Sequence, residues 1–571
     1  MTARRTLTLV FLGLSLTLLI AGAVAALRLR PGPFGRSGAV LTVTVGDDLP
    51  EEAPASWIGR FVSGDRRTFG DLVGLFERAA RDDRVQAIVA RIAPSDLGWA
   101  RLQELHDAMR AFGDSGKILA CHAEVLDSPA YFLASACDTI DLPPTGVFSV
   151  PGVALQVEFY KGALGKLGIE AEMEHVGAYK SASEPLTRQD LSVPAREQLE
   201  AMLDAVYASL VEAVADARDI APETVRRLLD GGLLAPDQAL EAGLVDDLRY
   251  YDEVLDDVKD QVGPRAEEVE DTSYLREVRA HRRAGRDRIA VIYASGMIVS
   301  GASEESGLLG RVLGSETLIE SLQRARDNPA VKAVVLRVDS PGGSGPASDA
   351  IWRETQRVRE KKPLVVSMGD VAASGGYWIA AGADAIVAEP LSLTGSIGVV
   401  GGKFYLKPFY DWIGVSKEIL KRGRNADLYT DYNRFSDEQR RMVRASMIAL
   451  YREFLARASE GRRKSQEEID RVAQGRVWTG GQALERGLVD ELGGLASALD
   501  RARALAKIPA GRSVGIDLYP RPKGLLESLA GLQGALTRAA RGPDPASEAR
   551  LAQRLLGERV LALMPFRVTL R

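Results

Sequence analysis

The sequence predicts an α/β protein in which one folding unit occurs twice in tandem. Short β-branched apolar runs alternate with amphipathic stretches along the chain, which is typical of parallel strands joined by crossover helices. One such run, VQAIVAR at Val85–Arg91, recurs 246 positions later as VKAVVLR at Val331–Arg337. Because self-similarity at a fixed spacing indicates a repeated structural unit, we expect two copies of one α/β unit.

The spacing continues through both copies. At 246 residues it pairs Ser128 with Ser374, and at 244 residues it pairs QALEAGLVD (Gln238–Asp246) with QALERGLVD (Gln482–Asp490). The second copy has therefore lost two residues between these points.

Each copy is also expected to contain one long helix. Ser436 and Gln439 have the spacing of a capping box, in which a serine hydroxyl and a glutamine side chain satisfy the first backbone N–H groups. A long helix is therefore predicted from Ser436 to Ala458, and its counterpart in the first copy starts at Ser192.

The first residues of the chain differ from the rest. Leu7–Leu27 is an uncharged run that follows Arg4 and Arg5, and as a helix it would span about 30 Å, enough for a bilayer core. We interpret residues 1–30 as an uncleaved membrane anchor. The small residues Ala21–Ala26 leave a cleaved signal peptide as the alternative.

The chain of 571 residues is therefore divided into five parts. The charged stretch between the two copies is interpreted as a solvated helix or linker. The sequence does not decide between three roles for the C-terminal extension: packing on the catalytic domain, pairing with another protomer, or lying on the membrane surface. The parts are the anchor (1–30), the first repeat (35–250), the linker (251–287), the second repeat (288–510) and the extension (511–571).

Composition and charge exclude several classes of function. A net charge of −5 gives no basic surface for nucleic acid, and no metal-ligand spacing is present. Gly395–Phe404 has a Gly-Lys pair but lacks the first glycine and the Ser or Thr of a phosphate-binding loop, so no ATP site and no cofactor are expected. The simplest interpretation of Cys121 and Cys137 is two buried thiols, with one disulfide as the alternative.

The second copy contains a serine with the surroundings of a nucleophile. Ser374 lies between an apolar β-branched run, Pro363–Met368, and an apolar helix-like run, so it is expected on a strand-to-helix turn beside unpaired N–H groups. Upstream, the DSPGGSG stretch follows another predicted strand. N–H groups of Gly342 or Gly343 and of Gly375 can hold the oxyanion that forms when such a serine attacks a carbonyl.

The first copy differs at these positions. Its counterpart of DSPGGSG is APSDLGW, without paired glycines, and Ser128 precedes Pro129, which has no N–H to donate. We interpret Ser128 as a helix cap. Conversely, Lys180 lies in a loop of the first copy. The equivalent loop of the second copy, residues 424–435, is shorter and contains no lysine. Each copy therefore holds half of a site, if the two loops face each other.

A lysine can serve as the general base only when it is neutral. That requires burial to lower its pKa from about 10.4 to roughly 7 to 8. No histidine follows His281, so a histidine base for Ser374 would have to be His122 or His175 of the first copy. The structural alternatives are a capping role for Ser374 and a solvated Lys180.

The strings DSPGGS, AASGGYW and TGSIG, together with GAYKSASEPLTR around Lys180, resemble the long, two-repeat form of the bacterial signal peptide peptidase A family. The resemblance covers roughly residues 35 to 520. It implies two crotonase/Clp-protease-like repeats in which Ser374 is the nucleophile and Lys180 is the general base. It also implies that Ser396, in TGSIG, orients the lysine, although a turn serine is an equal interpretation from the sequence.

The resemblance further implies a serine endopeptidase that degrades cleaved signal peptides and other unfolded or short apolar peptides. Such an enzyme is expected to be a homo-oligomer anchored by a single pass in the bacterial cytoplasmic membrane, with its catalytic domains on the outer, periplasmic side. A non-proteolytic scaffold or acyl-thioester-binding protein on the same fold is the alternative. Lys180 discriminates between them, because a binding module has no use for a desolvated amine facing Ser374.

Overall fold

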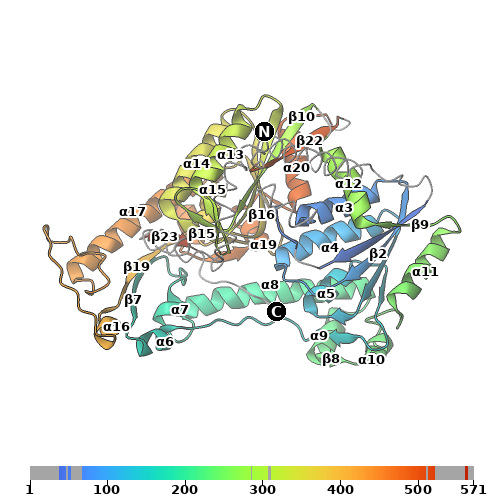
Figure 1. Cartoon of the computed structure of the whole chain (residues 1–571), viewed down its shortest axis with the longest axis horizontal. Coiled ribbons are helices and arrows are strands. Elements are labelled where there is room, and N and C mark those ends of the chain that lie inside the picture. Colours follow the sequence, from blue (N-terminus) through green and yellow to red (C-terminus); the bar gives the residue numbers. More distant parts are fainter. Residues whose placement is uncertain are drawn as a thin grey trace, which may run out of the picture.

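The computed structural model describes residues 38–46, 49–52, 67–283, 286–306, 310–509, 512–520 and 560–563. Two lobes, blue to green and yellow to orange, are each built around a mainly parallel sheet that is packed with helices (Figure 1). Within these residues no helix has both the length and the apolar character needed to cross a membrane. The predicted anchor at 1–30 and most of the predicted extension lie outside the described residues.

The first repeat is organised around a five-stranded sheet with strand order β5-β3-β2-β1-β9, in which every neighbouring pair is parallel. Apolar side chains of these strands and of the helices that cover them form one large buried cluster. The elements are β1 (Ala39–Val45), α3 (Phe69–Ala80), β2 (Val85–Ile92), α4 (Trp99–Gly113), β3 (Ile118–Ala123), β4 (Val125–Leu126), α5 (Ser128–Ala134), β5 (Thr139–Asp141), β6 (Val147–Ser149), α6 (Lys161–Lys166), β7 (Glu170–Val176), α7 (Glu184–Thr187), α8 (Val193–Arg218), α9 (Pro222–Asp230), β8 (Leu233–Leu234), α10 (Pro236–Glu241), α11 (Tyr251–Val262), β9 (Glu267–Glu270) and α12 (Asp271–Arg283).

The second repeat has a sheet with strand order β20-β18-β16-β14-β10-β22, from which β17 pairs with β16 and β21. Its order β17-β16-β14-β10 matches β5-β3-β2-β1, which confirms the internal repeat. The elements are β10 (Asp287–Ser295), β11 (Met297–Val299), β12 (Glu304–Ser306), β13 (Gly310–Gly314), α13 (Ser315–Asp327), β14 (Val331–Ser340), β15 (Gly342–Ser344), α14 (Gly345–Arg359), β16 (Leu364–Ala373), α15 (Gly375–Ala380), β17 (Ala385–Ala388), β18 (Leu393–Gly395), β19 (Val399–Tyr405), α16 (Lys407–Trp412), α17 (Asp437–Arg462), α18 (Gln466–Val472), β20 (Val477–Thr479), α19 (Gly480–Glu485), β21 (Glu491–Leu492), α20 (Leu495–Leu505), β22 (Val514–Tyr519) and β23 (Val560–Leu563).

The predicted long helices are present as α8 and α17, each of 26 residues. Ser192 caps α8, and Ser436 caps α17 with Gln439 completing the capping box. In Figure 1, α8 runs along the lower edge of the molecule and α17 along its left side. The serines fix the residue at which each helix begins, because their hydroxyls accept from backbone N–H groups that have no partner inside the helix.

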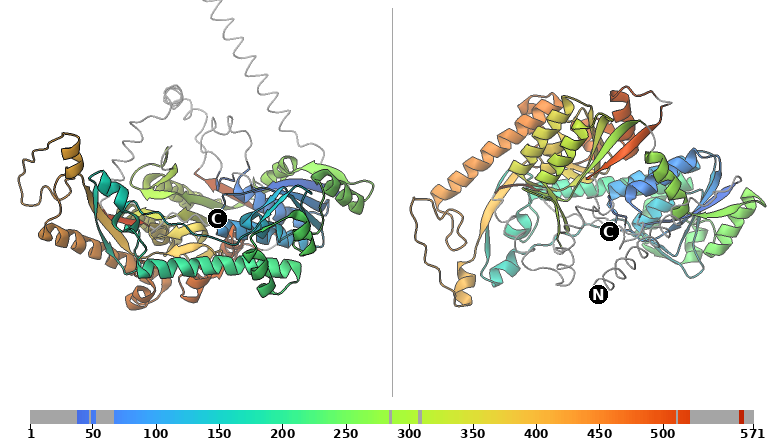
Figure 2. Two further views of the ribbon diagram at one scale, coloured as in Figure 1. Left: turned by 90° about the horizontal axis from the view of Figure 1, so that it is seen from below. Right: turned by 45° about the horizontal axis from the view of Figure 1, so that its top comes forward.

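A third sheet joins the two repeats. Its strand order is β12-β13-β11-β15-β23-β19-β7, so β7 of the first repeat continues a sheet of the second. The strands β7 and β19 pair antiparallel over their whole length, from Val399 opposite Val176 to Tyr405 opposite Glu170. They lie side by side, teal and orange, in both views of Figure 2. This pairing fixes the loop that follows β7 against the second repeat.

Buried charges also link the repeats. Arg337 of β14 is 1% exposed, and its guanidinium contacts Glu51 at 3.1 Å and Glu104 of α4 at 2.7 Å. Its counterpart at the 246-residue spacing, Arg91, is exposed and stacks on the ring of Tyr251 at 4.0 Å. The same residue type therefore has opposite environments in the two copies, because only Arg337 faces the other repeat.

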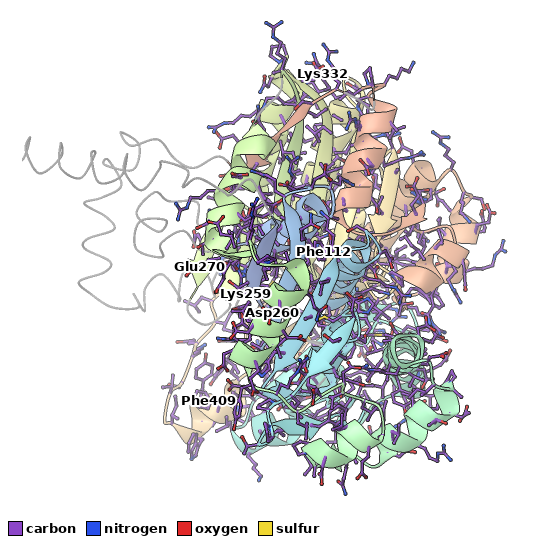
Figure 3. All side chains as sticks on the ribbon, turned by 90° about the vertical axis from the view of Figure 1, so that its right-hand side faces the viewer. Phe112, Lys259, Asp260, Glu270, Lys332 and Phe409 are labelled. Atoms are coloured by element: carbon purple, nitrogen blue, oxygen red, sulfur yellow. A yellow bond between two sulfur atoms is a disulfide. The ribbon has the colours of Figure 1, made fainter. Side chains whose placement is uncertain are left out.

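The segment predicted to be a solvated helix or linker, 251–287, contains α11, β9 and α12 in its described part, and two of these elements pack on the first repeat. Strand β9 pairs parallel with β1 at the edge of the first sheet, and α11 buries Val254, Leu255 and Val258. Figure 3 shows charged side chains such as Lys259 and Asp260 on this helix. The high charge of the segment reflects one exposed helix face, while its apolar positions complete the core of the first repeat.

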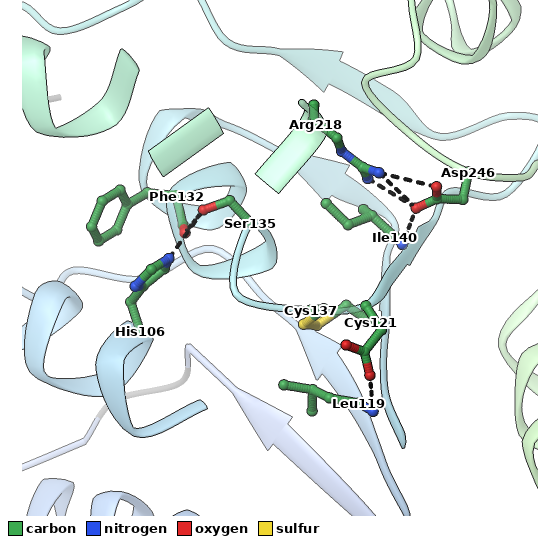
Figure 4. The surroundings of a disulfide bond; sticks show 10 residues. His106, Leu119, Cys121, Phe132, Ser135, Cys137, Ile140, Arg218 and Asp246 are labelled. Carbon is green, nitrogen blue, oxygen red and sulfur yellow. Dashed lines mark hydrogen bonds and ion pairs between the residues drawn. A yellow bond between two sulfur atoms is a disulfide. The ribbon is translucent and has the colours of Figure 1, made fainter. Parts of the chain in front are cut away.

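The two cysteines form a disulfide, so the interpretation of two buried thiols is wrong. Cys121 of β3 and Cys137, which follows α5, have Cα atoms 5.9 Å apart (Figure 4). Apolar flanking sequence predicted burial, and Cys121 is fully buried, but burial alone does not distinguish a thiol from a bridge.

Candidate active site

Ser374 lies on the predicted strand-to-helix turn. Strand β16 ends at Ala373 and α15 begins at Gly375, so the serine occupies the connection between them. Its backbone has φ 56° and ψ −115°, a conformation that L-residues rarely adopt, and its N–H donates to the carbonyl of Gly395 at 2.8 Å. The side chain is completely buried. The turn therefore holds the hydroxyl in one fixed position.

Lys180 of the first repeat reaches this serine from the opposite lobe. Its Nζ lies 2.7 Å from Ser374 Oγ, 2.8 Å from the carbonyl oxygen of Ser396 and 3.0 Å from Ser396 Oγ. The lysine is 1% exposed and both serines are fully buried. The two loops that the sequence places 194 residues apart therefore meet in one closed site.

Burial lowers the pKa of Lys180 well below the ordinary value of 10.5. The polar partners of its amine are hydroxyl and carbonyl oxygens rather than a carboxylate that would favour the charged form. A neutral amine at 2.7 Å can accept the proton of the Ser374 hydroxyl, which is the arrangement needed for a nucleophile and its general base.

Ser396 is fixed in the same manner as Ser374. It follows β18 in the TGSIG stretch, has φ 50° and donates its N–H to the carbonyl of Arg476 at 2.7 Å. Its carbonyl and hydroxyl oxygens are both within hydrogen-bond distance of Lys180 Nζ. These two contacts define the direction of the amine relative to Ser374.

The predicted oxyanion glycines border Ser374, but they are not equivalent. The N–H of Gly342 donates to Ser340 Oγ at 3.1 Å and is therefore already engaged. A Cβ atom on Gly375 would lie 3.1 Å from the nitrogen of Gly343, so the backbones of these two residues are adjacent. The first N–H of α15, that of Gly375, has no acceptor within its helix. The backbones of Gly343 and Gly375 therefore lie side by side next to Ser374.

A residue that the sequence did not indicate fixes the lysine loop. Gln198 of α8 is 1% exposed, and its side-chain amide donates to the carbonyl of Tyr179 at 3.2 Å and to Ser181 Oγ at 2.9 Å. Its Oε1 accepts from the N–H of Val477 at 3.0 Å. Gln198 therefore joins both flanks of Lys180 to strand β20 of the second repeat. In the sequence, the only feature that marks Gln198 is its position as a polar residue on an otherwise apolar helix face.

The corresponding position in the first repeat has no such site. Ser128 is the first residue of α5 and donates to the carbonyl of Gly152 at 2.5 Å, whereas Asp127 caps the helix through the N–H of Ala130. The prediction that Ser128 is the cap is therefore wrong, because the preceding carboxylate takes that role. Among the described residues, no group of three or more His, Cys, Asp and Glu side chains could hold a metal ion.

The histidines considered as alternative bases have other surroundings. His175 lies on β7 opposite Val400, and its Nδ1 is 3.1 Å from the carbonyl oxygen of Gly177. His122 is buried on β3 with its ring edge-on to Tyr251. The hydrogen-bonding position beside Ser374 Oγ is occupied by Lys180.

Comparisons with known proteins agree with a repeated peptidase. The family model described as Peptidase family S49 matches this chain twice, at residues 111–264 and 356–509. The chain is 35% identical to the serine protease SPPA, chloroplastic, of Arabidopsis thaliana over 85% of this chain and 72% of that protein. It is 34% identical to Protease 4 of Salmonella typhi over 77% and 72% of the two chains, and 30% identical to Protease 4 of Haemophilus influenzae over 80% and 75%.

Among solved structures, a mutant ClpP1 from Listeria monocytogenes aligns with 37% of this chain and 94% of its own, at 13% sequence identity and a TM-score of 0.24. The two family matches start 245 residues apart, within one residue of the spacings of 246 and 244 in the internal repeat. By these matches and by its likeness to the three proteases over most of its length, the chain belongs to peptidase family S49 and is a serine peptidase.

Proposed function

We propose that this protein is an endopeptidase in which Ser374 is the nucleophile and Lys180 is the general base. The observation that carries the proposal is the 2.7 Å contact between Lys180 Nζ and Ser374 Oγ inside a buried site formed by both repeats. Burial supports the role of the lysine because it favours the neutral amine.

The reaction follows from this geometry. The Ser374 hydroxyl transfers its proton to Lys180 as its oxygen attacks the peptide carbonyl, and the N–H groups of Gly343 and Gly375 stabilise the negative charge on the carbonyl oxygen. The lysine ammonium then protonates the leaving amine, which leaves an ester on Ser374. Water, deprotonated by the same lysine, attacks the ester carbonyl, and the lysine returns this proton to Ser374 Oγ as the bond between that oxygen and the acyl carbon breaks and the acid is released. Ser396 keeps the amine directed at Ser374 throughout.

The proposed substrates are unfolded or short apolar peptides, including cleaved signal peptides. A relative from Enterococcus faecium that is 30% identical over 39% of this chain bears the name putative signal peptide peptidase SppA, which supports this class. We further propose a homo-oligomer anchored through residues 1–30 in the bacterial cytoplasmic membrane, with both repeats on the periplasmic side. The long uncharged run Leu7–Leu27 supports the anchor.

A peptide-cleavage assay on three variants tests the proposal. Ser374→Ala and Lys180→Ala should each abolish cleavage while the circular dichroism spectrum of the folded protein is retained. Ser128→Ala is the matched control, because Ser128 is the equivalent residue of the other repeat, and it should keep full activity. Substantial cleavage by either of the first two variants would exclude the proposed pair. An acyl-thioester-binding or scaffold role would leave all three variants alike.

A further inference from the structure

Helix α4 of the first repeat begins after a glycine, so its N-cap residue, Gly98, has no side chain with which to cap the helix. The residue 246 positions later is Ser344, whose hydroxyl caps α14 by accepting from the N–H of Ala347 at 3.3 Å. In the first repeat the equivalent N–H, that of Arg101, donates instead to Asp370 Oδ1 of the second repeat at 3.0 Å. A carboxylate from the other lobe therefore takes the place of the capping side chain.

The contact between Asp370 and α4 has a second part. The guanidinium of Arg101 donates to Asp370 Oδ2 and forms an ion pair with it. Both side chains are largely buried, with 17% of Arg101 and 15% of Asp370 exposed. A Cβ atom on Gly98 would collide with the carboxyl group of Asp370, so this close approach requires a glycine at the N-cap of α4.

Asp370 lies in a bulge of β16 that comes shortly before the nucleophile. The pairing of β14 with β16 runs up to Val338 opposite Met368. It resumes two residues later on β14 but four residues later on β16, at Ala372. A bulge bends its strand and changes the direction of the side chains that follow it. The position of Ser374, four residues after Asp370, therefore depends on how this bulge is held.

Asp339 joins the same bulge to the strand that leads into the glycine turn. It is the residue of β14 between the two stretches of pairing, and its Oδ1 accepts from the N–H of Val371 at 3.0 Å. Its carbonyl oxygen accepts from the N–H of Gly296 at 2.9 Å, and Gly343 follows it by four residues. The bulge is therefore held on one side by the start of the glycine turn and on the other by α4, which belongs to the repeat that carries Lys180.

We propose that Asp370 is a positioning residue for Ser374, because its contacts with Arg101 hold the β16 bulge and thereby direct the serine hydroxyl at Lys180. This inference rests on the proposed function for its consequence in catalysis, although the contacts themselves do not. Asp370 acts through the backbone that it holds rather than on the peptide, so its loss should slow the chemical step and leave peptide binding little changed. The same contact makes the catalytic geometry depend on the docking of the two repeats.

Steady-state kinetics of the full chain with a short apolar peptide test the proposal. Asp370→Ala should lower kcat about tenfold, while KM changes less than about twofold. Glu124→Ala is the matched control, because Glu124 is the exposed residue 246 positions earlier in the first repeat, and it should keep wild-type kcat. Wild-type kcat in Asp370→Ala would overturn the proposal.

A second substitution separates positioning from helix capping. In the Asp370→Ala background, Gly98→Ser gives α4 the kind of cap that Ser344 gives α14, and the carboxyl group that would collide with a side chain at position 98 is gone. The urea midpoint, lowered by the loss of the cap, should then recover, while kcat stays about tenfold low. Recovery of kcat together with the midpoint would show that Asp370 only caps α4 and would overturn the proposal.

The Arg101 side chain gives a test that does not depend on that recovery. Arg101→Met removes the guanidinium but keeps the backbone N–H that donates to Asp370, so it should lower kcat about threefold without removing the cap. Combined with Asp370→Ala it should cause no further loss, because both substitutions break the same contact. Wild-type kcat in Arg101→Met, or losses that multiply in the double variant, would overturn the role of this pair.

Hydrogen exchange distinguishes a failure of this inference from a failure of the proposed function. The amides of residues 371–374 should exchange at least about tenfold faster in Asp370→Ala than in Glu124→Ala, and unchanged protection of β10 in both variants shows that the fold is intact. If the wild-type chain cleaves no peptide, the proposed function fails and the exchange comparison decides alone. Equal exchange at residues 371–374 in the two variants would then overturn the positioning role.

Discussion

At the scale of single residues, the candidate site is held by two strained serines. Ser374 and Ser396 both have positive φ, 56° and 50°, which costs each of them about 1–3 kcal/mol. Each is fixed by a backbone hydrogen bond, from Ser374 to Gly395 and from Ser396 to Arg476. The surrounding core therefore imposes the two conformations that direct their oxygens at one lysine amine.

Asp339, which precedes the glycine turn, is a second unusual ionisable residue. Burial, and next the neighbouring carboxylate of Asp370, raise its pKa to about 7, against the opposing effect of Arg101. The folded state therefore binds a proton at this residue between its ordinary pKa of 3.8 and about 7, where the unfolded chain does not. The bound proton therefore contributes its full stabilisation of the folded state below pH 3.8, and this contribution is lost as the pH rises through about 7.

Replacing this carboxyl by an amide should remove that pH dependence. Asp339→Asn keeps an oxygen for the N–H of Val371, which Asp339 Oδ1 accepts at 3.0 Å. We expect the free energy of unfolding of the variant, relative to wild type, to increase as the pH is raised from about 5 to about 8. Urea unfolding at several pH values measures this difference. A difference that is constant with pH would show that Asp339 is ionised in the folded protein.

At the scale of elements, helix α8 positions the lysine although it supplies no reacting group. Gln198 joins Tyr179 and Ser181, on both sides of Lys180, to Val477 of β20. Gly475, which precedes β20, also approaches the lysine so closely that a Cβ atom on it would lie 2.5 Å from Lys180 Cβ. The lysine loop is therefore fixed by the second repeat as well as by the first.

The variant Gln198→Leu should lower kcat about tenfold while KM changes little, because a misplaced general base slows the chemical step rather than peptide binding. Steady-state kinetics with a short apolar peptide measure both constants. The midpoint of the pH profile should stay unchanged, because the lysine remains buried. Arg196→Ala, an exposed position on the same helix, is the control. Wild-type kcat in Gln198→Leu would show that the loop holds its position without this residue.

At the scale of the whole molecule, the site exists only while the two repeats stay together. Strand pairing between β7 and β19 is one connection, and the buried contacts of Arg337 with Glu51 and Glu104 are another. Glu104 also accepts from the N–H of Leu495 at 2.6 Å. A substitution that separates the repeats should therefore abolish activity without touching Ser374 or Lys180.

Removing one partner of Arg337 should be costly. Glu104→Ala is expected to lower the free energy of unfolding by about 3–5 kcal/mol, because it leaves a buried guanidinium partly uncompensated. Glu320→Ala, which breaks the exposed pair with Arg324, should cost less than about 1 kcal/mol. Chemical denaturation of both variants gives the comparison. Equal losses in the two would mean that solvent reaches Arg337.

Comparing the two copies within the sequence explains what could be predicted. The fixed spacing indicated the repeat. The glycines beside Ser374, which Ser128 lacks, indicated that the nucleophile is in the second copy. The loss of lysine from residues 424–435 directed attention to Lys180. The structure brings Lys180, Ser374 and Ser396 together, and their catalytic roles remain predictions.

Other features could not be predicted because they depend on long-range packing. Arg91 and Arg337 align in the two copies, yet only the second is buried between the repeats. Gln198 aligns with Met442 in the other copy, so comparing the two copies gives no indication that this position holds the lysine loop. Strand β23 pairs with residues more than 150 positions earlier, and no local pattern specifies such a partner.

The central claim, that neutral Lys180 deprotonates Ser374, is tested most directly by the pH dependence of labelling with a serine-directed phosphonate, with the modified residue mapped by mass spectrometry. We predict that Ser374 is the residue labelled and that its rate rises with pH and levels off well below 10.5, because burial lowers the pKa of Lys180. In Lys180→Met, labelling should be at least about 100-fold slower. Equal labelling rates in the variant and the wild type would contradict the account.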